Sequence, residues 1–313
     1  MNHRKFPLIA AYIAMSGTGA VHAENSIPEA IAGGEADLAF RYRVETVDQD
    51  GLAASAAAST LRTRLTWKSA QFGAWNASLE VDNVSYLGGD NFNSLRNGRS
   101  NYPVVADPRG TGINQAKLRY QAGSANAVLG RQRINMDNQR FIGGVGWRQN
   151  EQTYDGATFA WSDEQLSASY SYLTRISRVF GPDDGTPAAT LDASAHLLHA
   201  TAALGGGEVT GYAWLLEFDD AAALSSQTVG ASYEVQLDSG EWQWPVHLEY
   251  ARQTDYGNQT ADYSAGYLHG SIGGKRGPVT ATLGFERLDA DNDAGRSFST
   301  PLATLHKFNG WAD

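Results

Sequence analysis

The sequence predicts an all-β protein, namely a transmembrane antiparallel β-barrel of about 13 strands. From residue 36 onward, segments of about ten residues alternate apolar and polar side chains, which is the pattern of strands with two different faces. The connections between these segments alternate between short turns and long loops, as they do at the two ends of an outer-membrane barrel. No apolar stretch approaches the ~20 residues of a membrane-spanning helix. A soluble all-β fold is the alternative, and it would not alternate its connections in this way.

The N-terminus is typical of a secretory signal peptide. Arg4 and Lys5 form a basic start, residues 6–15 are mostly apolar, and a Val-His-Ala cleavage site follows. The chain has no cysteine, which excludes a lipoprotein anchor, disulfides and thiolate metal sites. The expected division of the chain is a signal peptide (1–23), a short periplasmic N-terminal segment (24–35) and the outer-membrane barrel (36–313).

The first expected strand covers residues 36–47. It places Leu38 and Phe40 on one face and Arg41 and Arg43 on the other. The same alternation recurs along the chain at residues 61–68, 75–82, 166–172 and 228–237, whereas residues 195–204 and 262–272 are ambiguous in their facing. Pro245 opposes the pattern, because proline removes a ladder hydrogen bond, and we expect it at a bulge or a strand rim.

The connections fall into two classes. Short turns rich in Gly, Ser and Asp are expected at residues 69–73, 122–125, 162–165, 205–207, 238–240 and 273–277. Longer loops are expected at residues 48–59, 87–113, 134–153, 177–194, 219–225 and 254–261. Antiparallel closure of a bacterial barrel needs an even number of strands. Thirteen strands and an end that reads as a loop therefore predict a barrel that is incomplete at the C-terminus.

The two faces of the expected strands suit lipid outside and water inside. Charged residues make up only 19% of the chain, while Gly, Ser and Thr are abundant. Aromatic residues occur on the apolar face near strand ends, where they would form girdles at the membrane interfaces. The residues concerned are Tyr42, Trp67, Trp75, Tyr120, Trp161, Tyr172, Trp242 and Trp244.

Two stretches of the chain resemble a known family. Residues 130–134 (GRQRI), 137–143 (DNQRFIG) and 146–155 (GWRQNEQTYD) are similar to one signature of the alginate export family of outer-membrane porins, and residues 299–313 are similar to another. The resemblance implies an eighteen-stranded barrel in the bacterial outer membrane that passes an anionic uronate polymer through an Arg-rich pore, together with periplasmic export partners. Against that family, this chain would be truncated by about five strands.

The polar face of the strands carries a basic set of residues. Arginine suits carboxylate-bearing solutes because its planar fork pairs bidentately. The alternative is that these arginines only pair with acids on the same face, such as Asp37, Glu45, Glu80, Asp82, Glu217, Glu234, Glu249 and Glu286. Lys68, Lys117 and Arg175 share the basic face, and Arg140 and Arg148 lie in a long loop that could fold inward. The expected pore-lining residues are Arg41, Arg43, Arg62, Arg64, Arg119, Arg131, Arg133, Arg140 and Arg148.

These features predict a porin for passive passage of anionic polysaccharides, oligosaccharides or small anions, in contact with outer-membrane lipid. The net charge of −10 argues against nucleic acid as a partner. His196 and His199 are three residues apart, and the other mature histidines are distant in sequence, so we expect no catalytic residues, no metal and no cofactor. The alternatives are an outer-membrane hydrolase, and a general small-solute porin or structural barrel without alginate specificity.

Overall fold

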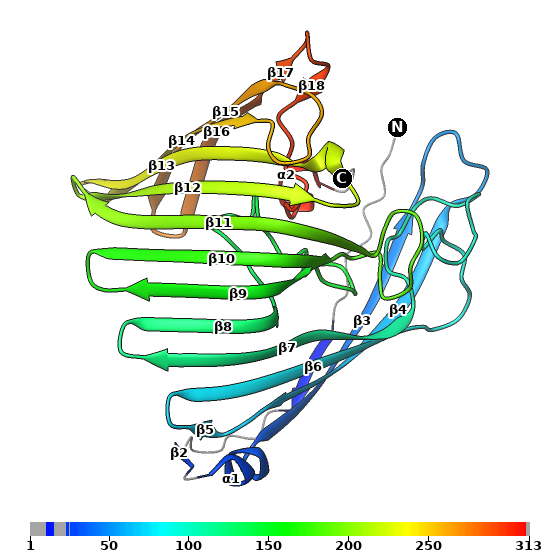
Figure 1. The fold of residues 1–313 in the computed structure, drawn as a ribbon. Helices are drawn as coiled ribbons and strands as arrows, with labels where there is room; N and C mark the ends of the chain where they lie inside the picture. The colour runs from blue at the N-terminus through cyan, green and yellow to red at the C-terminus, as the bar shows by residue number, and fades with distance from the viewer. Residues whose placement is uncertain (1–10, 16–22, 25, 311–313) are drawn as a thin grey trace.

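The computed structural model describes residues 11–15, 23–24 and 26–310 of the 313-residue chain, and one large antiparallel sheet dominates it (Figure 1). Within these ranges, thirteen long strands follow one another as neighbours in chain order, as the alternation predicts. They are β3 (Glu35–Val47), β4 (Ala56–Lys68), β6 (Trp75–Tyr86), β7 (Gly110–Ala122), β8 (Ala125–Gln132), β9 (Thr153–Ser162), β10 (Leu166–Ser177), β11 (Thr190–Leu204), β12 (Gly207–Phe218), β13 (Ser226–Ser239), β14 (Trp242–Thr254), β15 (Ser264–Arg276) and β16 (Val279–Leu288).

The short elements lie at the edge of this sheet or in the connections between its strands. β1 (Ala11–Met15) pairs antiparallel with β3, and β2 (Ala23–Glu24) pairs with β5 (Gln71–Phe72). The rest of the expected signal peptide lies almost entirely outside the described residues. The remaining elements are α1 (Ile27–Ala32), the 3₁₀ helix η1 (Ala222–Leu224), β17 (Ala290–Asp291), β18 (Arg296–Ser297) and α2 (His306–Asn309). None of the helices in the described ranges is long and apolar enough to cross a membrane.

The two ends of the sheet differ as the sequence predicts. At one end, which we call the turn end, neighbouring strands are joined by a few residues, as between β7 and β8. At the other, the loop end, long connections such as residues 87–109 join them. The path of paired strands runs from β1 to β16, and in the described residues β16 pairs with neither β1 nor β3. The sheet is therefore curved but open (Figure 1).

The outer face of the sheet is apolar except near the loop end. Leu65, Leu129 and Leu283 are 49%, 62% and 76% exposed, which is the surface that lipid would cover. The expected aromatic residues gather mainly at the turn end, within three residues of a strand end. Those six are Trp67, Trp75, Tyr120, Trp161, Trp242 and Trp244.

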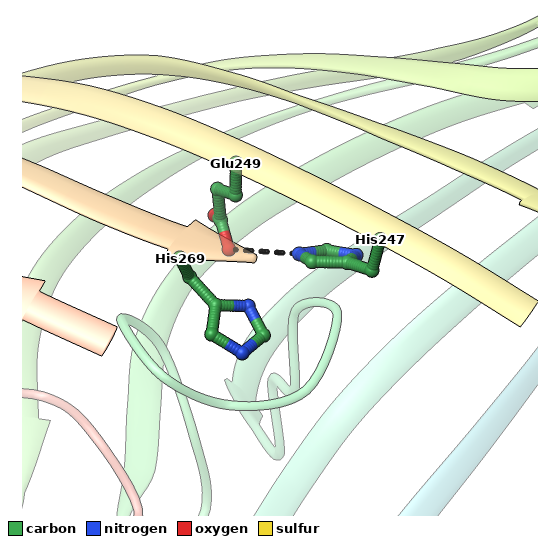
Figure 2. A group of neighbouring side chains, drawn as sticks. All are labelled: His247, Glu249 and His269. Carbon is green, nitrogen blue, oxygen red and sulfur yellow. Dashed lines mark hydrogen bonds and ion pairs between the residues drawn. The ribbon is translucent and has the colours of Figure 1, made fainter. Parts of the chain in front are cut away.

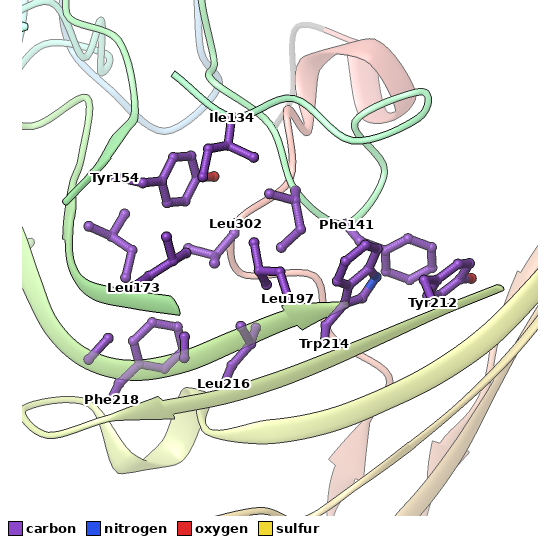
Figure 3. Close-up of a cluster of buried hydrophobic side chains, with 14 of the residues drawn as sticks. Ile134, Phe141, Tyr154, Leu173, Leu197, Tyr212, Trp214, Leu216, Phe218 and Leu302 are labelled. Atoms are coloured by element: carbon purple, nitrogen blue, oxygen red, sulfur yellow. The ribbon is translucent and has the colours of Figure 1, made fainter. Parts of the chain in front are cut away.

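The inner face is apolar at one place, where the sequence predicts a polar wall. Trp214, Leu216 and Phe218 of β12 are buried together with Leu197 of β11, and they pack under the connection between β8 and β9 (Figure 3). This cluster also includes Ile134, Phe141, Tyr154, Leu173 and Leu302. The polar face of a strand is therefore replaced by an apolar one where a loop covers it.

Arg175 and Glu217, which were expected on the inner face, lie on the outer one. Arg175 follows an irregularity in the pairing of β10, which reverses the facing of the strand, and its side chain is 48% exposed beside Asp192. Glu217 alternates with the buried Leu216 and Phe218, so it lies on the outer face of β12. Pro245 lies within β14, and the register to β15 skips it opposite Gly273. We expected a bulge or a strand rim at Pro245, and the structure instead shows an interruption in the pairing of β14 with β15.

Candidate pore site on the inner face

The connection between β8 and β9, which we call the inner loop (residues 133–152), crosses the inner face of the sheet. At one side Arg148 Nη1 lies 3.2 Å from Glu45 Oε2 on β3. At the other, Arg140 Nε lies 2.8 Å from Glu286 Oε1 on β16. The loop expected to fold inward therefore does so, and it joins the two opposite flanks of the open sheet.

Polar contacts fix the inner loop on β3 and β4. Gln149 is fully buried, and its amide Nε2 donates to the hydroxyl of Thr60 at 2.9 Å. Its backbone N–H donates to Asp107 Oδ1 at 2.8 Å, and its Oε1 accepts from Arg41 Nε at 3.0 Å. Because a buried amide without partners would be costly, this residue specifies the position of the loop.

Glu151 is the centre of a cluster of ion pairs. Its carboxylate lies 3.2 Å from Arg62 and 3.0 Å from Arg64, and it accepts from Arg133 Nε at 2.7 Å. Burial alone would raise the pKa of this carboxyl, but the charges of Arg64, Arg133 and Arg62 outweigh it and lower the pKa to about 2. Asn114 Nδ2 donates to the same carboxylate at 3.1 Å. Glu151 is therefore ionised and held.

The strands supply further acids to the same cluster. Arg64 on β4 is directly opposite Asp82 on β6, and it donates bidentately at 2.7 and 2.6 Å. Glu80, two residues before Asp82, lies 3.0 Å from Arg133. The structure therefore shows acid pairing, the alternative reading of the basic face, for these arginines.

Trp147 contacts two guanidinium groups. Arg43 is 4.8 Å and Arg148 is 4.0 Å from its ring centroid, and His306 of the C-terminal segment stacks on it at 3.9 Å. Arg43 also pairs with Glu45 at 2.5 Å.

Three other bases on the inner face hydrogen-bond to neutral acceptors. Arg41 donates to Gln149 and to the carbonyl of Gly146, Arg119 donates to Asn126 at 2.8 Å, and Lys117 donates to Gln115 at 2.8 Å. Their charges are thus not neutralised by these partners. Lys117 and Arg119 line a cavity of about 1050 Å³ at the turn end, below the inner loop.

Arg131 lies on the other face of the sheet. It has the strand parity of the exposed Leu129, and it donates bidentately to Asp155 of β9, both at 2.7 Å. Inner positions of β8 belong to Asn126 and Val128, which line the cavity. Arg133 turns inward because it lies beyond the end of β8. The expected pore role of Arg131 is therefore wrong.

The structure also brings together three residues that the sequence analysis did not connect. His247 and Glu249 of β14 and His269 of β15 offer ligand atoms within 4.8 Å of one another (Figure 2). Two of them share a face because they are two residues apart, and the third is opposite Glu249 in the register. A nine-residue connection separates β14 from β15. A connection of this length does not determine the register of the two strands, so the proximity of His269 to Glu249 could not be predicted from the sequence.

Comparisons with known proteins place the fold. No family model matches the chain, and no curated protein sequence matches it. Among solved structures, it is similar to OccAB4 of Acinetobacter baumannii (15% identity, 83% of this chain and 68% of that chain, TM-score 0.63) and to OccD3 (OpdP) of Pseudomonas aeruginosa (13%, 91% and 63%, TM-score 0.63). It is also similar to P. aeruginosa OpdK, solved with vanillate (14%, 82% and 67%, TM-score 0.62).

This is the fold of the Occ and Opd outer-membrane porins. The fold class and the outer-membrane setting predicted from sequence agree with these neighbours, which are channels rather than enzymes. The resemblance to the alginate export family is wrong, because the structural neighbours are Occ and Opd porins instead. The eighteen strands, the uronate polymer and the export partners rested on that resemblance. This chain spans 63–68% of the length of the three neighbours.

Proposed function

We propose that the sheet is the wall of an outer-membrane channel for small solutes with a modest preference for anions. The observation that carries the proposal is the contrast between the two faces. Away from the loop end the outer face is apolar, whereas the inner face is crossed by a loop held by buried ion pairs. An inward-folded loop narrows a barrel and leaves a solute path along the remaining wall. The likeness to OpdK, which was solved with vanillate, supports a small solute.

The preference for anions rests on the cavity at the turn end. Its bases are Lys68, Lys117, Arg119 and Arg133, and its acids are Glu35, Asp37 and Glu80. The lining therefore carries four bases against three acids, and Arg133 and Glu80 pair with each other. Lys117 and Arg119 are two residues apart on β7 and therefore form a local positive site. The paired arginines around Glu151 hold the loop instead of attracting solutes.

In lipid, the proposal requires that the free edges of the sheet be paired, because each unpaired amide would cost several kcal/mol. Channel activity of the purified full chain would therefore also indicate that these edges are paired in the membrane. Planar-bilayer recording should show stable openings, and reversal potentials in asymmetric KCl should show anion selectivity.

The residue test removes positive charges from the cavity and, as a control, from the outer face. The double variant Lys117→Ala/Arg119→Ala should lower the ratio of anion to cation permeability by roughly twofold or more, since both charges face the cavity. Arg175→Ala is the control, because this arginine is half exposed and paired with Asp192. Cation selectivity of the unmodified chain, or an unchanged ratio in the double variant, would refute the anion path. Absence of any conductance would refute the channel.

A further inference from the structure

The inner face of β13 to β16 carries a stripe of titratable residues that the channel proposal does not use. The register places Glu234 opposite His247, Glu249 opposite His269, and His269 opposite Glu286. These side chains come from four adjacent strands and share one face. Nitrogen and carboxylate ligands are thereby collected on the wall facing the ionic cluster of β3 to β6.

Three of these residues converge on one point. One ring nitrogen of His247, one of His269 and one oxygen of Glu249 all lie within 4.8 Å of one another (Figure 2). Nε2 of His247 is 3.4 Å from Glu249 Oε2. Nδ1 of His269 is buried and makes no hydrogen bond within the described part of the chain. Such an unsatisfied buried nitrogen is costly unless something else occupies its lone pair.

The surrounding groups orient these three side chains as the outer shell of a metal site does. His247 Nδ1 lies 2.8 Å from Glu234 Oε1, which directs the other ring nitrogen toward Glu249. The hydroxyl of Tyr212 donates to Glu249 Oε1 at 2.7 Å and leaves Oε2 facing the histidines. Ligating histidines commonly donate their second nitrogen to a carboxylate in this way. The stripe therefore contains three possible metal ligands together with two residues, Glu234 and Tyr212, that orient them.

Glu286, the third acid of the stripe, interacts with other residues. It pairs with Arg140 of the inner loop at 2.8 Å and accepts from Tyr267 at 2.9 Å. Glu286 is thus held by other partners, which leaves two histidines and one carboxylate as the ligands. His247 and Glu234 also line a cavity of about 510 Å³, which gives an ion a route to the site.

We propose that His247, Glu249 and His269 bind a divalent transition-metal cation of the Zn²⁺ class on the inner wall. Imidazole and carboxylate suit Zn²⁺, whereas Mg²⁺ and Ca²⁺ prefer all-oxygen sites. Three protein ligands leave the fourth tetrahedral position open toward the interior. The cation places positive charge on a wall that otherwise carries Glu234, Glu249 and Glu286. This inference does not depend on the channel activity proposed above.

The test measures Zn²⁺ binding to the full-length chain, purified from outer membranes in detergent and stripped with a chelator. Calorimetric titration should find one Zn²⁺ per chain, and Co²⁺ should give the visible absorption of a tetrahedral site. His247→Ala and His269→Ala should each weaken Zn²⁺ binding by more than about 100-fold. Glu234→Gln, which keeps all three ligands, should weaken it by about tenfold.

His199→Ala is the matched control, because His199 also faces inward and also pairs with a carboxylate, Asp137, at 2.8 Å. It should bind Zn²⁺ as the unmodified chain does. Far-UV circular dichroism and heat-modifiable migration on gels establish that each variant is folded. Failure of the unmodified chain to bind Zn²⁺, or equal affinity in the ligand variants and the His199 control, would overturn the proposal.

Discussion

Replacing Glu151 with glutamine tests whether the ionic cluster holds the inner loop in place. The carboxylate interacts with Arg62, Arg64 and Arg133, and the ordinary pKa of 4.5 falls to about 2 in the folded protein. At about 1.4 kcal/mol for each pKa unit, this drop corresponds to about 3 kcal/mol of folding free energy. Because the folded pKa is depressed, this stability is present above pH 4.5 and is lost as the pH falls toward 2.

The assay is urea unfolding in detergent micelles, followed by tryptophan fluorescence between pH 7 and pH 2. At pH 7, Glu151→Gln should lower the free energy of unfolding by about 3 kcal/mol. The difference between the variant and the unmodified chain should shrink as the pH falls from 4.5 toward 2. Other carboxylates titrate in both proteins, so the difference isolates Glu151.

Glu164→Gln is the control, because this glutamate is exposed in the turn between β9 and β10. Its effect should stay within about 0.5 kcal/mol at any pH. If Glu151→Gln differed from the unmodified chain by a constant amount over the whole pH range, the argument from the depressed pKa would fail.

Three further predictions follow from packing and charge. Trp214→Ala should lower the free energy of unfolding by about 3–5 kcal/mol, because the ring is fully buried in the inner cluster, whereas the exposed Trp242→Ala should cost much less by the same urea titration. Gly156→Ala should destabilise the sheet by about 1–3 kcal/mol, because its Cβ would lie 2.1 Å from the carbonyl oxygen of Tyr172. Gly211→Ala, whose Cβ would meet open space, should change the free energy of unfolding by no more than about 0.5 kcal/mol. Equal melting temperatures for the two variants would contradict this. Raising KCl from 0.1 M to 1 M should reduce anion selectivity in reversal-potential measurements, because the Debye length falls from ~10 Å to ~3 Å; selectivity independent of salt would argue against surface charge as its origin.

The sheet could be predicted from the sequence because period-two alternation and turn residues act locally. Each strand, such as β13 with its regular alternation, and each short turn carries its own signal within ten to fifteen residues. The interior could not be predicted in this way. The inner loop buries Trp214 on the inner face of β12, and nothing near Trp214 in sequence records that contact.

The outward facing of Arg131 and the proximity of His247 and His269 were missed for the same reason. The facing of β8 depends on its register to β7 and β9, since one residue of slip exchanges the two faces. His269 meets Glu249 only through the register of β14 and β15. The charged residues of a short strand do not show which of its faces lines the interior. A family resemblance based on short stretches of the chain did not resolve this facing either.

The inner loop bears on the order in which the molecule assembles. Its hydrogen bonds join residues far apart along the chain, 108 positions for Arg41 with Gln149 and 146 for Arg140 with Glu286. The hairpins of the sheet join near neighbours, so their closure costs less entropy and proceeds faster. The strands therefore pair first, and the loop docks into a sheet that is already curved. During refolding into lipid, backbone protection in β9 and β10 should appear before the burial of Gln149, and the loop is the last part of the interior to become fixed.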